Sequence, residues 1–284
     1  MANATLRKQL NEGTFIMAPG IYDMISAMMA DQMGFKALYV TGYGISASHL
    51  GLPDAGLMGY SDILSRVSQI TERCQTPVVA DADTGYGGLL NVRHTVRGYE
   101  RAGVSGIQIE DQEFPKKCGH TQGRRVVPTE DMVRKIQVAC EARTDENMMI
   151  IARTDSRTSL GLDEALRRSE AYAAAGADII FLESPESIEE LHVIAQRIEK
   201  PLLANLVSGG RTPVVSQTEL QEIGYSMAIH PALGFLSAGF ALRKGYQELA
   251  QTGDVKNQEL YDFQEFCKLV GFEDVWDFDA KWAE

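Results

Sequence analysis

The sequence has little positive charge, few cysteines and no long hydrophobic run. Its 27 lysines and arginines are outnumbered by 39 aspartates and glutamates, which leaves a formal net charge of −12 over 284 residues. This acidic balance argues against a protein that binds nucleic acid or a membrane surface through a basic face. No apolar stretch approaches the roughly 18 residues that a membrane-spanning helix needs. We therefore expect no nucleic-acid partner and no membrane association.

The cysteines exclude several further classes of protein. There are four of them, scattered along the chain, and they form no CxxC pair of the kind that binds zinc or performs redox chemistry. The first ten residues show no hydrophobic signal-peptide core. Together these absences lead us to expect reduced thiols and a cytoplasmic protein. With 44% hydrophobic and 23% charged residues, the chain has the composition of a globular protein with a sizeable core.

Eight short and almost purely apolar runs recur along the chain, and each is followed by a segment with helical periodicity. Unbroken apolar runs are typical of strands covered on both faces, as in a parallel sheet surrounded by helices. Glycines such as Gly103 and Gly224 end a helical pattern shortly before such a run, as a left-handed helix cap does. The predicted strands are Phe15–Ala18, Leu38–Val40, Val78–Ala80, Ile107–Ile109, Met149–Ala152, Ile179–Leu182, Leu202–Ala204 and Met227–Ile229.

The segments between these runs are predicted to be amphipathic helices. Thr129 and Asp163 stand where a side chain could cap the start of a helix. Because strands and helices alternate without a break at mid-chain, the pattern favours a (β/α)8 TIM-type barrel, with an open doubly wound sheet as the alternative. We predict a single barrel domain over residues 1–284, of which 233–284 form a C-terminal helical extension. Predicted helices include Ile21–Met33, Tyr60–Arg73, Leu90–Ala102, Leu162–Ala175, Leu233–Ala250 and Asn257–Val270.

Polar side chains follow most of the predicted strands, at the end where barrel enzymes place catalytic groups. Asp81, Asp83 and Glu110 would bring carboxylates together at one mouth, which is costly unless a cation or protons compensate. Carboxylates without histidine or cysteine at ligand spacing favour Mg²⁺ or Mn²⁺ over zinc. The other interpretation is that these acids cap helices or form ordinary salt bridges. Their number, with Arg153 on a neighbouring strand, favours a cation site.

A long segment between Glu110 and Thr129 carries the sequence Lys116-Lys117-Cys118-Gly119-His120. Loops of this length in a compact barrel are more often lids or binding loops than simple connections. A cysteine flanked by lysines and a histidine can have a lowered thiol pKa and exchange protons near neutrality. An incidental exposed thiol is the other interpretation, and these residues alone leave the two open.

Several of these segments together resemble one known superfamily. They are Val40-Thr-Gly-Tyr-Gly44, Leu50-Gly-Leu-Pro-Asp54, Ala80-Asp-Ala-Asp-Thr-Gly-Tyr-Gly87, Ile109-Glu-Asp-Gln112, Lys116-Lys-Cys-Gly-His120, Ala152-Arg-Thr-Asp155 and Ala204-Asn205. In this order they resemble the isocitrate lyase/phosphoenolpyruvate mutase superfamily, from about residue 15 to about residue 235. The cysteine segment looks like the mark of its carbon–carbon lyase branch. Within that branch, Glu183-Ser-Pro185 and Gly209-Gly-Arg-Thr-Pro213 look most like the 2,3-dimethylmalate lyase group, followed by methylisocitrate lyases.

The resemblance implies roles for individual residues. Asp81 matches a direct ligand of Mg²⁺, and Cys118 matches an acid/base thiol on a gating loop. Arg153 matches the cationic partner of a substrate carboxylate. The other matches are Asp54, Asp83 and Glu110 as carboxylates that hold the ion through its waters, Thr41, Gly42 and Tyr43 as the backbone clamp on the substrate, Asn205 and Thr212 as further substrate-binding positions, and Tyr39, Glu183 and His120 as further catalytic positions, with Tyr39 a candidate base.

The resemblance also implies an activity and an assembly. It implies a magnesium-dependent lyase that cleaves a 2-hydroxy dicarboxylate to pyruvate, or a related 2-oxo acid, and a carboxylic acid. It implies a homodimer or homotetramer whose subunits exchange a C-terminal helix. Oxaloacetate hydrolysis to oxalate and acetate is an alternative, and a non-catalytic metabolite-binding barrel is another. Two departures from the pattern, Ser208 and His230, bear on the part of the substrate beyond the 2-oxo acid core.

Overall fold

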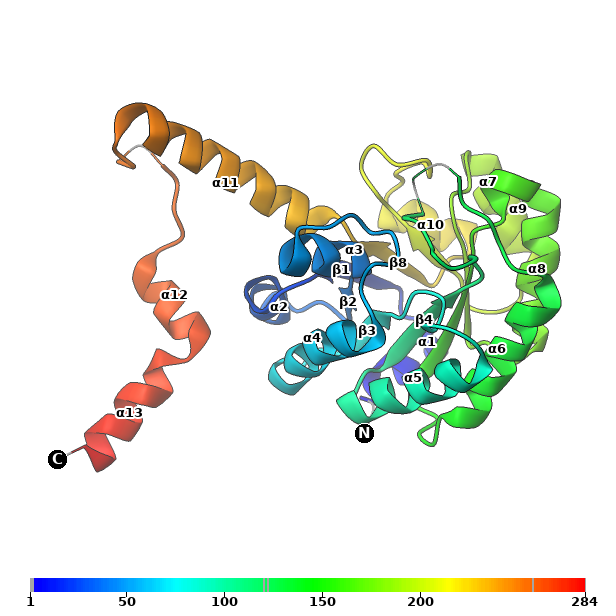
Figure 1. The fold of residues 1–284 in the computed structure, drawn as a ribbon, viewed down its shortest axis with the longest axis horizontal. Coiled ribbons are helices and arrows are strands. Elements are labelled where there is room, and N and C mark those ends of the chain that lie inside the picture. Colours follow the sequence, from blue (N-terminus) through cyan, green and yellow to red (C-terminus); the bar gives the residue numbers. More distant parts are fainter. Residues whose placement is uncertain (1–2, 120, 122, 257, 284) are drawn as a thin grey trace. The chain divides into compact units, whose positions relative to one another are not determined.

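The computed structural model describes residues 3–119, 121, 123–256 and 258–283. The chain divides into two compact units, Met1–Gly234 and Phe235–Glu284. The first unit contains a ring of parallel strands with helices around it (Figure 1). No helix of the described ranges is long and apolar enough to cross a membrane.

Eight parallel strands form the centre of the first unit, in the order β6-β5-β4-β3-β2-β1-β8-β7. A parallel bridge from Ile180 to Leu202 links β6 to the start of β7, which nearly closes the ring. This architecture confirms the predicted (β/α)8 barrel. The strands are β1 (Ile16–Ile21), β2 (Leu38–Val40), β3 (Val78–Asp81), β4 (Gly106–Glu110), β5 (Met149–Thr154), β6 (Ile179–Leu182), β7 (Leu203–Asn205) and β8 (Met227–His230).

The helices follow the strands as expected, with some shifted ends. Ile21 belongs to β1, where it pairs with Val40 of β2, and the next helix starts only after Asp23, whose carboxylate accepts from Ser26 N. The left-handed caps are confirmed, with φ of +90° at Gly103 and +114° at Gly224. The first unit contains α1 (Thr5–Asn11), α2 (Met24–Asp31), α3 (Gly42–Ile45), the π-helix η1 (Ser46–Leu50), α4 (Tyr60–Arg73), α5 (Leu89–Ala102), α6 (Thr129–Ala142), α7 (Arg157–Leu160), α8 (Leu162–Ala174), α9 (Ile188–Arg197) and α10 (Gln217–Ile223).

Two predicted helix caps are wrong. Thr129 is the first residue of α6, because the carbonyl of Pro128 already accepts the first helical hydrogen bonds. The Thr129 hydroxyl instead accepts from Arg167 Nη2 at 2.7 Å. Asp163 lies inside the first turn of α8, which starts after Gly161.

The barrel interior is filled by residues that alternate along the strands. Leu6 of α1, a helix that was not predicted, packs into the same cluster and is fully buried. The helix therefore covers part of the barrel interior. The cluster comprises Leu6, Ile16, Ala18, Ala37, Tyr39, Val79, Met149, Ile151, Ile179, Phe181, Leu203, Met227 and Ile229.

Gly20 in β1 lies against the turn that follows β8. A Cβ added there would lie 2.2 Å from the backbone oxygen of Pro231, which cannot move without shifting the Pro19–His230 strand pair. We expect Gly20→Ala to lower the free energy of unfolding by about 1–3 kcal/mol through overpacking. Urea denaturation measures this, with Gly88→Ala as control, because an added Cβ at Gly88 meets nothing within 4 Å. Equal midpoints for the two variants would contradict the prediction.

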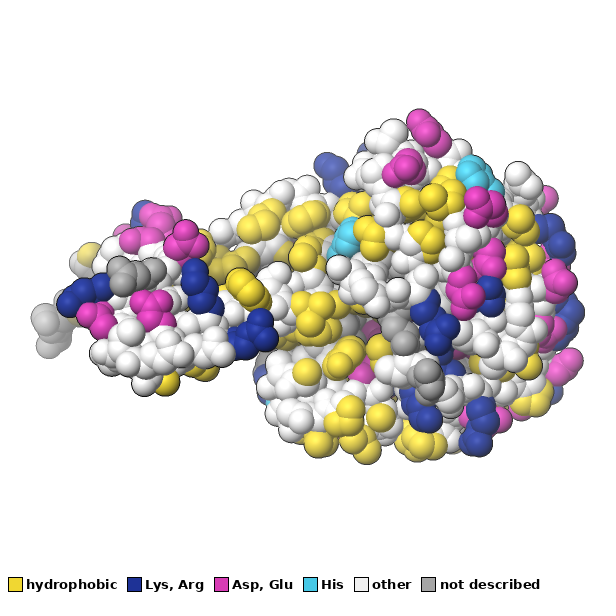
Figure 2. Space-filling view, turned by 90° about the horizontal axis from the view of Figure 1, so that it is seen from above, with side chains coloured by type: hydrophobic (Ala, Val, Ile, Leu, Met, Phe, Trp, Pro, Cys, Tyr) yellow, Lys and Arg dark blue, Asp and Glu magenta, His cyan; other side chains and the backbone are white. Residues whose placement is uncertain are grey.

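The second unit contains α11 (Leu233–Thr252) from Phe235 onward, α12 (Phe263–Val270) and α13 (Phe272–Trp282). The start of α12 lies later than predicted, because Asp262 caps the helix by accepting from Glu265 N. The predicted start, Asn257, lies outside the described residues, and α13 was not predicted. Apolar side chains are exposed on this unit (Figure 2), among them Phe240, Tyr246 and Phe278.

Candidate active site

The predicted site residues gather at the carboxyl ends of the strands. Asp81 ends β3, Glu110 ends β4 and Asn205 ends β7. Arg153 is the second-last residue of β5, and Glu183 directly follows β6. All five are at least nine-tenths buried. The barrel therefore brings together residues that are up to 124 positions apart, from Asp81 to Asn205.

Asp54, Asp81, Asp83 and Glu110 form what we call the acidic group, which is built around Asp81. Its Oδ1 accepts hydrogen bonds from Asp83 N at 3.1 Å and from Gln108 Nε2 at 3.2 Å. Asp83 has a left-handed backbone with φ of +47°, which folds the chain back toward Asp81. The end of β2 approaches the same carboxylate, since a Cβ added to Gly42 would lie 3.0 Å from Asp81 Oδ2. The predicted substrate clamp therefore adjoins the predicted metal ligand.

Lys116 lies among these acids. It belongs to the segment between Glu110 and Thr129 that contains Cys118, which we call the cysteine loop. Its Nζ forms an ion pair with Asp54 and lies 2.7 Å from Asp83 Oδ1, and the side chain is 3% exposed. Burial lowers the pKa of Lys116, but the surrounding carboxylates outweigh it and raise the pKa well above its usual value. The structure thus directs the Lys116 ammonium toward the acidic group, whereas the sequence suggested an effect on the Cys118 thiol.

The remaining negative charge of the group is poorly compensated. Burial raises the pKa of Asp83 to about 6, with Lys116 opposing the shift and Asp81 and Asp54 adding to it. Burial also raises the pKa of Glu110 well above its usual value, against the opposing charge of Arg153. Glu110 Oε1 is buried and has no hydrogen-bond partner among the described residues. A further cation would therefore be favourable here.

This donor set fits Mg²⁺ or Mn²⁺. Asp54, Asp81, Asp83 and Glu110 offer only carboxylate oxygens, the ligands that hard divalent ions prefer. Within the described ranges, no three acidic, histidine or cysteine side chains come together as a ready metal cage. Mg²⁺ typically binds one or two carboxylates and keeps several waters, so it does not need such a cage.

Arg153 is held by the buried carboxylate of Asp155, a residue of the matching segment Ala152-Arg-Thr-Asp155 to which no role was assigned. Its Nε and Nη2 donate to Asp155 at 2.8 and 2.9 Å, and its guanidinium lies over the ring of Phe181. Asp155 also accepts from Arg124 Nη1 at 2.7 Å. Burial lowers the pKa of Arg153, but Asp155, Glu110 and other acids raise it well above its usual value. This arrangement fixes a permanent positive charge at the mouth, where it can bind a carboxylate.

Tyr39 does not suit the role of a base. It is fully enclosed in the barrel, and its hydroxyl donates to Gln108 Oε1 at 2.9 Å. Burial, with the charge of Asp81, raises the pKa of Tyr39 well above its usual value. The phenol is therefore protonated at neutral pH, which argues against our expectation that it takes a proton from the substrate. Gln108, which links Tyr39 to Asp81, was missed, although it lies two residues before Glu110 and so faces the same side of β4.

The remaining predicted residues lie around the same mouth. Thr41 Oγ1 accepts from Gly44 N and so shapes the turn that contains Gly42 and Tyr43. Asn205 Nδ2 donates to Glu183 Oε2 at 2.9 Å. Thr212 is 3% exposed, and its hydroxyl has no hydrogen-bond partner in the described part of the chain. The predicted catalytic residue His120 lies outside the described residues.

The cysteine loop reaches over this mouth. The backbone N–H of Cys118 donates to the carbonyl of Asp54 at 3.1 Å. A Cβ added to the next residue, Gly119, would lie 2.3 Å from Arg153 Nη2 and 2.9 Å from Glu183 Oε2. The loop backbone therefore packs directly on the arginine that is placed to bind a carboxylate.

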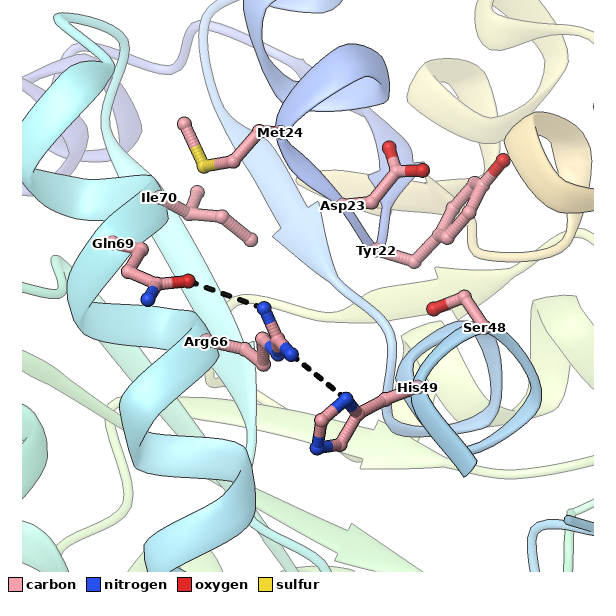
Figure 3. Close-up of a pocket in the computed structure, with 8 residues that line it drawn as sticks. All are labelled: Tyr22, Asp23, Met24, Ser48, His49, Arg66, Gln69 and Ile70. Carbon is pink, nitrogen blue, oxygen red and sulfur yellow. Dashed lines mark hydrogen bonds between the residues drawn. The ribbon is translucent and has the colours of Figure 1, made fainter. Parts of the chain in front are cut away.

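A separate pocket of about 170 Å³ lies on the outer side of the barrel, between α2, η1 and α4 (Figure 3). Arg66 crosses it and donates to His49 Nδ1 at 2.7 Å and to Gln69 Oε1 at 3.3 Å. None of the predicted site residues lines this pocket.

Comparisons with known proteins agree with this geometry. Residues 6–250 match the family model described as phosphoenolpyruvate phosphomutase. The chain is 44% identical to 2,3-dimethylmalate lyase of Eubacterium barkeri, over 99% of this chain and 98% of the relative. It is 42% identical to 2-methylisocitrate lyase of Aeropyrum pernix, over 97% of this chain and 89% of the relative. Both of these relatives are lyases.

Solved structures show the same relationship. A crystal structure of 2,3-dimethylmalate lyase, described as a PEP mutase/isocitrate lyase superfamily member, has a TM-score of 0.93 and 36% identity, and the match covers 100% of this chain and 96% of that one. Oxaloacetate acetylhydrolase in complex with 3,3-difluorooxalacetate has a TM-score of 0.93 and 32% identity, with 99% and 98% covered. The sequence match spans most of the chain and the structural match spans all of it. This chain therefore belongs to the PEP mutase/isocitrate lyase superfamily.

Proposed function

We propose that this protein is a magnesium-dependent carbon–carbon lyase. Its substrate would be a 2-hydroxy dicarboxylate of the 2,3-dimethylmalate or 2-methylisocitrate type, cleaved to pyruvate or a related 2-oxo acid and a carboxylic acid. The observation that carries this proposal is the cysteine loop, whose backbone packs on Arg153 beside the buried carboxylates of Asp81, Asp83 and Glu110 and the partly buried Asp54. The lyases of known name that match nearly the whole chain support it.

The acidic group would hold the metal ion. Asp81 would bind Mg²⁺ directly, and Asp54, Asp83 and Glu110 would hold it through its waters, with Mn²⁺ as a possible substitute. When bound, the ion stabilises negative charge that develops on substrate oxygens. The carboxylates of this chain supply the opposing charge, and Gln108 and the Asp83 N–H orient Asp81 by hydrogen bonds.

The substrate would be held by one charged group and by backbone. Arg153 would bind the substrate carboxylate, because Asp155 fixes its guanidinium while leaving other N–H groups to donate. The backbone of Thr41, Gly42 and Tyr43 would hold the same end of the substrate, since Gly42 adjoins Asp81. The Thr41 N–H already donates to the Ile21 carbonyl, so the N–H groups of Gly42 and Tyr43 would be the donors. Asn205 and Thr212 would contact the substrate from the end of β7 and the loop that follows it.

Cys118 would act as the proton donor. When the C2–C3 bond breaks, the C2 hydroxyl becomes a carbonyl and its proton passes to solvent. The electron pair of the bond remains on the departing carboxylic acid, and that carbon must receive a proton. The Cys118 S–H would supply it, leaving a thiolate that is reprotonated from solvent. Glu183 and His120 would be further catalytic positions, and the burial of Glu183 next to Arg153 supports this role for Glu183.

The C-terminal helices would form contacts between subunits. Residues 233–284 would be a helical extension of the single barrel domain, exchanged with a second copy in a homodimer or homotetramer. The exposed aromatic and aliphatic side chains of α11, α12 and α13 support this, because monomers rarely leave such a surface uncovered.

A panel of 2-hydroxy dicarboxylates tests the proposed reaction. With Mg²⁺ present, we expect 2,3-dimethylmalate or 2-methylisocitrate to yield a 2-oxo acid, measured by reduction with a coupled dehydrogenase. Oxalate formed from oxaloacetate, without any 2-oxo acid from the panel, would instead identify an oxaloacetate hydrolase, a reading favoured by the structural match to that enzyme. Binding of Mg²⁺ and oxalate without either reaction would identify a metabolite-binding barrel.

A further inference from the structure

Ser184 is a buried residue with an unusual backbone conformation that the proposed mechanism does not use. It follows Glu183 at the end of β6, has no exposed surface, and its φ is +62°. A left-handed backbone is uncommon for residues other than glycine, asparagine and aspartate. Where it occurs elsewhere, the surrounding structure holds it in place, often at a functional site.

The side chain of Ser184 connects the end of β6 to the cysteine loop. Its Oγ donates to the backbone oxygen of Gly119 and to Glu183 Oε1, both at 3.2 Å, so its one proton is shared between these two acceptors. Gly119 lies 65 positions earlier in the chain, so this contact exists only because the loop crosses the mouth. The hydroxyl therefore bridges the catalytic end of a strand and the backbone next to Cys118.

The loop is held at two points on either side of the Cys118 thiol. On one side the Cys118 N–H donates to the Asp54 carbonyl at 3.1 Å. On the other side the Gly119 carbonyl accepts from Ser184. Gly119 lies close to Arg153, since it has no Cβ. A small displacement of the Gly119 carbonyl would therefore also shift the adjacent Cys118 thiol relative to a substrate bound to Arg153.

We propose that Ser184 is a positioning residue. Its left-handed backbone turns the hydroxyl toward the loop, and the hydroxyl fixes the Gly119 carbonyl and with it the Cys118 thiol. The inference rests on the proposed proton donation by Cys118. Ser184 contacts Glu183 and the Gly119 carbonyl, and among the described residues its hydroxyl forms no hydrogen bond with the acidic group or with Arg153.

Alkylation of Cys118 by iodoacetamide tests this in the full-length protein, with Mg²⁺ and oxalate present and peptides quantified by mass spectrometry. One neutral hydrogen bond changes an equilibrium by about two- to tenfold, so Ser184→Ala should raise the Cys118 alkylation rate by that factor. Ser184→Gly should behave like Ser184→Ala, because glycine relieves the backbone strain but supplies no donor. Ser187→Ala, three residues along the same loop, should leave the rate unchanged, since its Oγ caps α9 by accepting from Glu190 N.

The outcomes separate this inference from the proposed function. Wild-type alkylation rates in both Ser184 variants would overturn it. A raised Cys118 alkylation rate in Ser184→Ala together with a wild-type rate in Ser184→Gly would also overturn it, because backbone strain and not the hydroxyl would then control the rate. In turnover, both variants should lower kcat by about two- to tenfold with KM nearly unchanged, since Arg153 and Asp155 are untouched. If the wild-type protein forms no 2-oxo acid, the proposed function fails, while the alkylation rates still decide the role of Ser184.

Discussion

Replacement of Cys118 by serine is expected to lower turnover about 10²- to 10⁴-fold, or roughly 3–5 kcal/mol of activation free energy. Serine keeps the shape of the side chain but is a far weaker acid than a thiol, so it cannot protonate the departing carbon efficiently. Substrate affinity should change little, because Arg153 and the acidic group are untouched. The measurement is steady-state kinetics on the best substrate of the panel, together with a melting curve to confirm that the fold is intact.

Cys140→Ser is the matched control for this variant. Cys140 lies on α6, outside the mouth, where its thiol donates to the carbonyl of Gly176. Burial raises the pKa of Cys140, and it raises that of Cys74 to about 11, so neither thiol is suited to exchange protons near neutrality. We expect Cys140→Ser to retain wild-type turnover. Near-normal turnover in Cys118→Ser would reduce Cys118 to a loop residue and remove the proton-donor mechanism.

Replacement of Asp81 by alanine is expected to abolish both Mg²⁺ binding and turnover. Stabilisation by a bound ion amounts to several kcal/mol, so turnover should fall by about 10³-fold or more. If Asp81→Asn also loses Mg²⁺ binding and turnover, both losses are due to the missing negative charge of Asp81 and not to a change in the shape of the site. Asparagine keeps an oxygen that can accept from Gln108 and the Asp83 N–H, and it removes only the negative charge.

Calorimetric titration with Mg²⁺ measures the first of these effects, and the coupled assay measures the second. Asp62→Ala serves as control, because Asp62 is an exposed residue that caps the start of α4 by accepting from Gly59 N. It should lose some stability and no metal affinity. A Mg²⁺ affinity in Asp81→Asn equal to that of the wild type would show that the ion is held elsewhere.

The sequence by itself determined the barrel and the position of its mouth. Strands enclosed on both faces are mostly apolar, and in β2 and β6 an unbroken apolar run predicts both ends of the strand. In a parallel barrel all strands end at one side, so a polar residue that follows an apolar run must lie at the mouth. Asp81, Glu110 and Asn205 could be placed on this ground alone.

Short elements could not be predicted in this way. The helix α1 has seven residues, and Leu6 is its only buried one, so its stability depends on the barrel it packs into. The helix α13 mixes acidic and aromatic residues, and none of its described residues is buried within the chain. Local pattern is weak in both cases, because tertiary or intersubunit packing supplies most of the stability of such helices.

Only the tertiary structure decided how the site residues are paired. Lys116 is next to Lys117 and Cys118 in sequence, yet its ammonium lies between Asp54 and Asp83 because a loop crosses the mouth. Asp155 accepts from Arg124, and Ser184 donates to the Gly119 carbonyl, so both residues make contacts with other segments of the chain. Such contacts cannot be predicted from the residue type alone. Periodicity indicates which face of an element is buried. Whether a hydrogen bond or an ion pair forms depends on differences of a few tenths of an ångström in the distances between groups on separate segments. Those distances exist only in the folded chain.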